Sequence, residues 1–204
     1  MTMKTALVWP LLAVLALAAC GEDDDYASRD SNGPICGNKQ IRGVKVDPIG
    51  TGGGCGIANP VKVSSVSGVM LQMQPVLNCE AATALNTYVR EGAKPAIGKT
   101  GGGLQSIDIV AHYACRRRNN LPQGKLSEHA RGNAVDIAGF NLRNGETLTV
   151  LGDWASGKHA KTVQALHKTA CGPFGTVLGP RSDRFHRDHF HFDVADYRSG
   201  PYCR

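Results

Sequence analysis

The spacing of hydrophobic residues along the chain predicts two helices. From Cys79 to Glu91, apolar side chains recur at intervals that place them on one face of a helix. Asn78 can cap the start of this helix, while Gly92 and Pro95 are expected to end it. The second helix is expected from about Lys158 to Thr169. Each helix would therefore bury one apolar face against other elements.

Alternation of apolar and polar residues predicts strands in much of the remaining chain. It is clearest from Leu104 to Cys115, where Ile107 and Ile109 share one face and Asp108 takes the other. Further strands are expected at Val61–Val66, Val69–Met73, Asn133–Phe140, Thr147–Leu151, Phe174–Leu178 and Phe190–Val194. Residues 36–60 are rich in glycine and turns, and are expected to form loops. The pattern therefore predicts an α+β fold, with a small antiparallel sheet flanked by a few helices.

The N-terminal residues are typical of an export signal rather than of a folded domain. Residues 1–19 contain one lysine, an apolar run too short for a comfortable membrane span, and small residues at the end. Leu17–Cys20 resembles the bacterial lipobox, in which the cysteine becomes the new N-terminus and carries a lipid. An ordinary signal peptide cleaved nearby is the alternative. Residues 20–35 would then form a flexible acidic tether, followed by one domain at residues 36–204.

The cysteines indicate an oxidising compartment. Six of the seven lie after Cys20, and an even number in an exported chain predicts up to three disulfides. We expect Cys115 to pair with Cys171, and Cys55 with Cys79. The expected location is the bacterial cell envelope, with a lipid on Cys20 in the membrane and the domain facing the periplasm. The glycine after Cys20 favours the outer membrane over the inner one, if enterobacterial sorting rules apply.

Charge does not indicate a nucleic-acid partner. The 204-residue chain has a formal net charge of +6, and its 42% hydrophobic and 20% charged content is ordinary for a globular protein. Its longest basic run is the triplet at 116–118, and no ladder of aromatic residues accompanies it. We therefore expect solvated surface charge and no nucleic-acid binding, although a basic balance also suits an anionic polymer such as cell-wall material.

Two separate segments contain candidate metal ligands. In the first, His129 lies seven positions before Asp136. In the second, His189 and His191 are two positions apart, so in a strand their side chains would point to the same face. Two imidazole nitrogens and one carboxylate oxygen are a common tetrahedral zinc set that leaves the fourth position open. The sequence therefore predicts a metal site of the catalytic type, carried by the small sheet.

The surroundings of Asp136 support a cation at this position. Val135, Ile137 and Gly139 are expected to face away from the carboxylate, on the other side of the strand. A buried carboxylate without a partner is costly, so a metal or a cationic side chain would stabilise it. His112 is expected to be a surface or supporting histidine rather than a ligand.

Longer stretches resemble the extensin-like C-terminal domain family of bacteria. The matching stretches are Tyr113–Arg116, Ser127–Phe140, Ala170–Cys171, Val177–Pro180 and His189–His191. The resemblance covers nearly all of the chain after about Cys55. It implies a type of domain more firmly than it implies a reaction.

The chain is also similar to a wider set of zinc peptidases, which includes lysostaphin-type enzymes, D-alanyl-D-alanine carboxypeptidases and the penicillin-insensitive murein endopeptidase. The residues that match their shared SxHxxGxAxD pattern are Ser127, His129, Gly132, Ala134 and Asp136. This resemblance implies that one zinc ion is bound by His129, Asp136 and His191.

The resemblance also implies catalytic roles. His189 would lie beside the metal-bound water as the general base, and His186 would line the cleft. In the D-alanyl-D-alanine dipeptidase branch the base is a glutamate three positions before the last ligand, where this chain has Asp188. Asp188 is therefore either a rival base or the group that orients an imidazole. The residues expected to bind substrate are Arg116, Arg131 and Ser127, with exposed solvated arginines as the alternative.

These observations predict a zinc metallopeptidase that hydrolyses peptidoglycan stem peptides or crosslinks, as an endopeptidase or a carboxypeptidase. Zinc would lower the pKa of water and polarise the scissile carbonyl, and a neighbouring base would take the proton. The alternative is a non-catalytic zinc-containing protein that binds the cell wall or acts as an envelope scaffold. Closed structural zinc sites usually have four protein ligands, so a three-ligand set favours the enzyme.

Overall fold

The computed structural model describes residues 1–2, 33–197 and 199–204. All but the first two residues of the predicted signal peptide, the predicted lipidation site Cys20, and the predicted tether up to residue 32 lie outside the described residues. Within the described part of the chain, no helix is long and apolar enough to cross a membrane.

Most strands join one large mixed sheet. The strands are β1 (Gly33–Ile35), β2 (Asn38–Lys45), β3 (Ile49–Gly52), β4 (Cys55–Ile57), β5 (Val61–Val66), β6 (Val69–Leu71), β7 (Val76–Leu77), β8 (Leu104–Ala111), β9 (Ala134–Leu142), β10 (Thr147–Thr149), β11 (Thr176–Leu178), β12 (Phe190–Asp193) and β13 (Tyr202–Cys203). The 11-stranded sheet has the order β1-β2-β5-β6-β8-β9-β12-β11-β13, with β10 beside β9 and β7 beside β5. A separate pair is formed by β3 and β4.

The α+β class predicted from the sequence is confirmed, but the predicted size of the sheet is wrong. Part of the glycine-rich stretch taken as loop forms β2, whose residues are mostly exposed or half-buried and so show little apolar alternation. Backbone hydrogen bonds to β5 hold this strand in place. The sheet is also not purely antiparallel, because β6 pairs with β8 and β11 with β13 in parallel.

A continuous helical segment follows β7. It consists of α1 (Cys79–Tyr88), the π-helical turn η1 (Val89–Ala93) and α2 (Lys94–Ile97). The predicted cap is confirmed, since Asn78 Oδ1 accepts a hydrogen bond from the Ala81 N–H at 2.8 Å. The predicted end at Gly92 is wrong. A Cβ at Gly92 would lie only 2.8 Å from the Thr169 side chain, so this glycine allows close helix packing instead.

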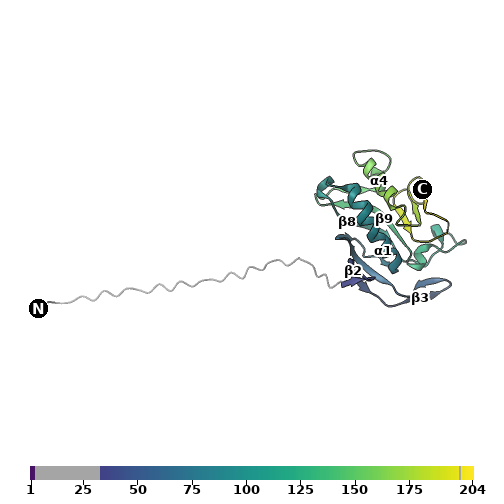
Figure 1. Ribbon diagram of the computed structural model, residues 1–204, viewed down its shortest axis with the longest axis horizontal. Helices are drawn as coiled ribbons and strands as arrows, with labels where there is room; N and C mark the ends of the chain where they lie inside the picture. Colours follow the sequence, from purple (N-terminus) through teal and green to yellow (C-terminus); the bar gives the residue numbers. More distant parts are fainter. Residues whose placement is uncertain (3–32, 198) are drawn as a thin grey trace.

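The remaining helices are short, apart from one. They are η2 (Thr100–Gly102), η3 (Arg118–Asn120), η4 (Glu128–Arg131), α3 (Val150–Asp153) and α4 (Ala160–Ala170). The predicted second helix corresponds to α4, which packs against η1 and α2. Figure 1 shows α1 and α4 with the sheet strands β8 and β9.

The central strands have one apolar face and one polar face. On β12, Phe190 and Phe192 point toward the helical side: the Phe192 ring lies 5.3 Å from that of Tyr88 in α1, and Phe190 lies 5.7 Å from Trp154. Because side chains alternate along a strand, His191 points to the opposite face. The apolar core therefore packs against the face of β12 opposite His191 and fixes the position of this strand.

A β-bulge in β9 lies next to Asp136. Ile109 pairs with Ile137, but Asp108 pairs with Gly139, so Ala138 is an extra residue in β9. The prediction that Gly139 faces away from Asp136 is therefore wrong. Gly139 shares the face of Asp108, whose Oδ2 would lie 3.0 Å from a Cβ at this position.

Three disulfides cross-link separate parts of the domain, and both predicted pairings are wrong. The bonds are Cys36–Cys79, Cys55–Cys115 and Cys171–Cys203. The first joins the β1–β2 turn to the start of α1, and the last joins the end of α4 to β13. The second joins β4 to the segment that follows β8 and leads to η4. The number of bonds agrees with the prediction from the even cysteine count.

We expect removal of Cys55–Cys115, through the double substitution Cys55→Ala and Cys115→Ala, to destabilise the domain. The two cysteines are 60 residues apart, and loss of that constraint on the unfolded chain corresponds to about 4 kcal/mol. Urea unfolding followed by circular dichroism measures the change. Peptide mapping without reductant provides the control, and a Cys115 peptide linked to Cys171 would contradict the structure.

Candidate metal centre

His129 is positioned by the short turn η4. The Ser127 hydroxyl caps this turn by accepting a hydrogen bond from the His129 N–H at 3.4 Å. Gly132 ends it in the left-handed conformation, with φ of 68°. A Cβ at Gly132 would collide with the Ile57 side chain and approach the Asn78 backbone nitrogen. The serine and the glycine of the SxHxxG motif therefore hold the turn that presents His129.

Asp136 and His191 come from neighbouring antiparallel strands. They face each other directly in the pairing of β9 with β12, so their side chains project from the same face of the sheet. The side chains of His129, Asp136 and His191 are nearly buried, with exposed fractions of 1%, 6% and 11%. Residues distant in sequence are thereby fixed by ladder hydrogen bonds and a capped turn.

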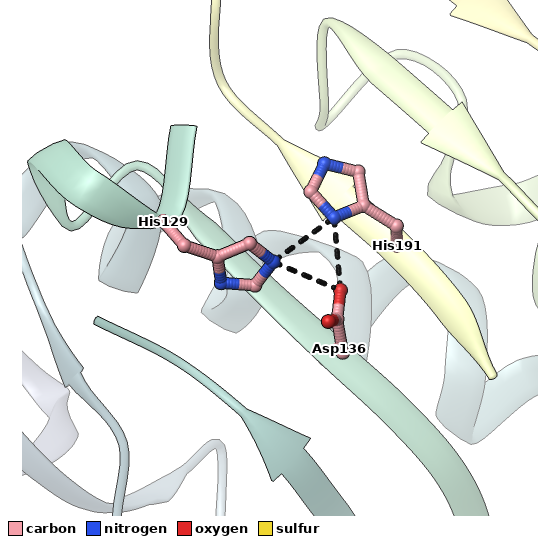
Figure 2. A group of neighbouring side chains, drawn as sticks. All are labelled: His129, Asp136 and His191. Carbon is pink, nitrogen blue, oxygen red and sulfur yellow. Dashed lines mark hydrogen bonds and ion pairs between the residues drawn. The ribbon is translucent and has the colours of Figure 1, made fainter. Parts of the chain in front are cut away.

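The three side chains converge on one point, as Figure 2 shows. Asp136 Oδ1 lies 3.1 Å from His129 Nε2 and 2.8 Å from His191 Nδ1, and the two nitrogens are 3.1 Å apart. Each imidazole uses its other nitrogen elsewhere. His129 Nδ1–H donates to the His112 carbonyl at 2.8 Å, and His191 Nε2–H donates to Asp193 Oδ2 at 3.0 Å.

These second hydrogen bonds turn three acceptors toward one another. In the neutral imidazoles, the lone pairs of His129 Nε2 and His191 Nδ1 face the Asp136 carboxylate. Acceptors packed this closely repel each other unless a proton or a metal cation lies among them. The three side chains could therefore hold a proton or a metal cation, and their supporting acceptors are of the kind that orient histidine ligands in metal proteins.

The pKa shifts of Asp136 and His191 also indicate that the cluster favours a positive charge. Burial acts to raise the pKa of Asp136, but hydrogen bonds to His129 and His191 outweigh it and hold that pKa well below its usual range. Burial acts to lower the pKa of His191, yet its hydrogen bonds to Asp136 and Asp193 raise it to about 9. Without a metal, His191 therefore carries the proton that the cluster requires.

The same donor set fits zinc. Zinc bonds of about 2.0–2.2 Å in tetrahedral geometry place neighbouring ligand atoms about 3.3 Å apart, close to the separations in this cluster. His129, Asp136 and His191 are also a group of His, Cys, Asp and Glu residues whose ligand atoms lie within 4.8 Å of one another. They would supply two nitrogens and one oxygen, and leave a position open toward the adjoining cavity.

His189 lies beside this cluster and is paired with Asp188. Its Nδ1–H donates to Asp188 Oδ1 at 2.8 Å, and its Nε2 lies 3.7 Å from Asp136 Oδ2. This pairing also lowers the pKa of Asp188, chiefly through the hydrogen bond. Asp188 itself is largely exposed, so of its two predicted roles the geometry favours orienting the imidazole.

His186 is held in the same manner by a carboxylate. Its Nδ1 is 2.8 Å from Asp183 Oδ1, and its ring lies 5.3 Å from His189 and 5.8 Å from His191. Burial lowers the pKa of His186, and Asp183 opposes this effect. His186 is therefore a nearly buried member of the cavity wall, next to the proposed base.

A cavity of about 610 Å³ opens above the cluster. Arg116 lines it, with Nη2 4.0 Å from Asp136 Oδ2. Ser127 also lines it, but its hydroxyl serves as the cap of η4. Arg131 is not among the lining residues: its side chain is 51% exposed and pairs with Glu128 Oε1 at 3.5 Å. Of the residues predicted to bind substrate, Arg116 is the best placed.

Several residues that support the cluster were not predicted from the sequence. Asp193 holds His191 and Asp183 holds His186, although neither was singled out. Asp193 could have been found, because it continues the alternation of His189 and His191 on one strand face. The contribution of His112 is its backbone carbonyl, which no sequence pattern reveals.

We expect Gly132→Ala to destabilise the domain by about 2–4 kcal/mol, since the change combines a left-handed backbone with crowding against Ile57. The control is Gly145→Ala. Gly145 also has positive φ, at 86°, but nothing lies within 4 Å of a Cβ there, so a loss of about 1–2 kcal/mol is expected. Urea unfolding compares the two, and equal losses would contradict the packing argument.

In metal-free protein, we expect the His191 imidazole to titrate near pH 9. Its pKa is raised above the ordinary 6.5, so its contribution to stability is complete below about pH 6.5 and disappears as the pH rises through about 9. Nitrogen-15 NMR of labelled histidines measures the titration. Zinc should abolish it by taking the same lone pair. A His191 that titrates near 6.5 in metal-free protein would contradict this geometry.

Comparison with known proteins identifies the family of the chain. Residues 35–204 match the family described as Extensin-like protein C-terminus. No curated protein and no solved structure matches the chain, so the similarity to zinc peptidases stays a prediction from the motif. The family match covers most of the chain, including every residue of the candidate centre. The chain therefore belongs to the extensin-like protein C-terminus family.

Proposed function

We propose that the domain is a zinc-dependent peptidase that hydrolyses peptidoglycan stem peptides or their crosslinks. One observation carries the proposal: three side chains that could hold a metal ion converge in the lining of a cavity, beside an imidazole whose Nδ1 is hydrogen-bonded to a carboxylate. A closed structural zinc site usually has four protein ligands. Three ligands with a neighbouring base favour chemistry at the remaining position.

The residues around the cluster can divide the work of peptide hydrolysis. His189 donates Nδ1–H to Asp188, so its Nε2 has the lone pair that can accept a proton from water. Asp188 would stabilise the resulting imidazolium, and Nε2 would return the proton to the leaving amine. Arg116 would attract the negative charge that develops on the carbonyl oxygen. When bound, zinc would supply Lewis-acid polarisation of water and of that carbonyl.

The location forms part of the proposal. Three disulfides support an oxidising compartment, as does the signal-like N-terminus. We propose that a lipid on Cys20 attaches the protein to the bacterial envelope membrane, the outer one in preference, with its domain facing the periplasm. A peptidase in this place would have a polymeric peptide substrate next to it.

We expect purified protein with zinc to cleave muropeptides, and His189→Ala to lower kcat/KM by about 10²–10⁴-fold while zinc still binds. His129→Ala should abolish both zinc binding and cleavage, because it removes a ligand. Lys161→Ala, an exposed change on α4, serves as the matched control and should leave both unchanged. Chromatography of the products and metal analysis of each variant make the measurement.

The same assay can reject the enzyme. If no stem-peptide or crosslink bond is cleaved in a zinc-dependent manner, the peptidase proposal fails. Binding of wild-type protein to intact cell wall without cleavage would then support the alternative, a zinc-containing wall-binding or scaffold protein.

A further inference from the structure

Two groups of residues that differ in charge line the cavity beside the candidate metal centre. Residues 183–191 contribute the imidazoles of His186 and His189. Residues 116–125 contribute three cationic side chains, those of Arg116, Arg118 and Lys125. Arg118 and Lys125 are exposed, while the metal-binding side chains are nearly buried, so these two cations lie toward the mouth.

Arg118 is held in place by Tyr197. Its Nη2 donates to the Tyr197 hydroxyl at 2.5 Å, and its guanidinium lies over the Tyr197 ring, 5.1 Å from the centroid. The Tyr197 hydroxyl in turn donates to the carboxylate of Glu128, which is only 3% exposed. Glu128 also accepts a hydrogen bond from Asn133 at 2.6 Å. A chain of contacts from the buried part of the site therefore orders this guanidinium.

Within the described residues, the positive charges of Arg118 and Lys125 are not neutralised by a carboxylate. In the part of the chain that the structure describes, neither Arg118 nor Lys125 forms an ion pair with a carboxylate. The interaction with Tyr197 uses one of the five N–H donors of Arg118. Arg117 differs, because it donates to the Gly124 carbonyl and does not line the cavity. An ordered guanidinium with free donors beside a second cation suits a carboxylate.

We propose that Arg118, ordered by Tyr197 and assisted by Lys125, selects peptides that carry a carboxylate away from the bond that is cleaved. The identity of the ligand as a peptide rests on the proposed peptidase function. The distance from the reacting bond follows from the placement of these cations at the mouth and of the metal cluster at the base. Stem peptides whose carboxylate has become a carboxamide would then bind more weakly.

The test compares two synthetic stem peptides that differ at one group, a side-chain carboxylate or the matching carboxamide. Binding is measured by calorimetry with zinc present, in His189→Ala protein so that peptide is not consumed. We expect the carboxylate peptide to bind about fivefold more tightly, and Arg118→Gln to remove this preference without changing affinity for the carboxamide. Arg118→Lys should restore part of it, since it keeps the charge but not the planar stacking. Tyr197→Phe should reduce it.

The matched control is Arg117→Gln, which removes the same charge from the neighbouring residue and should keep the preference. Equal binding of the two peptides, no binding of either, or an equal loss in Arg117→Gln and Arg118→Gln would each overturn the inference. Cleavage of muropeptides without carboxylate preference would refute this selectivity and leave the peptidase proposal standing. A carboxylate preference without any cleavage would support this selectivity and refute the peptidase proposal.

Discussion

The structure depends on holding three hydrogen-bond acceptors against one another. If both imidazoles are neutral, the lone pairs of His129 Nε2 and His191 Nδ1 meet Asp136 Oδ1 at separations of 2.8–3.1 Å, which is unfavourable unless a proton or a metal cation lies among them. The rest of the fold supplies the restraint. Asp136 and His191 are opposite each other on paired strands, and His129 lies on a turn fixed by a serine cap and a crowded glycine. A proton on His191 or a bound metal cation would relieve this repulsion.

Core packing and a disulfide also restrain the side chains of the cluster. Alternation on β12 places Phe190 and Phe192 in the apolar core and His191 on the polar face, so core packing fixes the ligand strand. Cys55–Cys115 ties β4 to the segment between β8 and η4, whose His112 carbonyl orients His129. Small rotations of an imidazole would misdirect its lone pair. A rigid surround is therefore necessary for a site of this kind.

Features of the chain that depend on local sequence could be predicted, whereas those that depend on distant partners could not. The Asn78 cap, α4 and the convergence of His129, Asp136 and His191 follow from short patterns or from a motif. The disulfide pairing does not, because six cysteines allow many pairings and only the sheet order brings Cys171 to Cys203. Likewise, Gly92 has the sequence signature of a helix end, but in the structure it allows the helical segment to pack closely against Thr169. The place of Arg131 outside the cavity also depends on tertiary packing.

Carboxylates determine which ring nitrogen faces the cavity in three of its four lining histidines, and the His112 carbonyl does so for His129. Asp183, Asp188 and Asp193 each accept from one imidazole, on His186, His189 and His191 respectively. A carboxylate partner fixes the tautomer and stabilises a positively charged imidazole. His189 could therefore accept a proton, and His191 could hold a proton or a metal, without reorienting. The cavity lining also includes Arg116, Arg118 and Lys125, which stay charged. If the cavity binds a peptide as proposed, the peptide would contact both imidazoles that can transfer protons and side chains of fixed positive charge. A purely structural zinc site would need neither group.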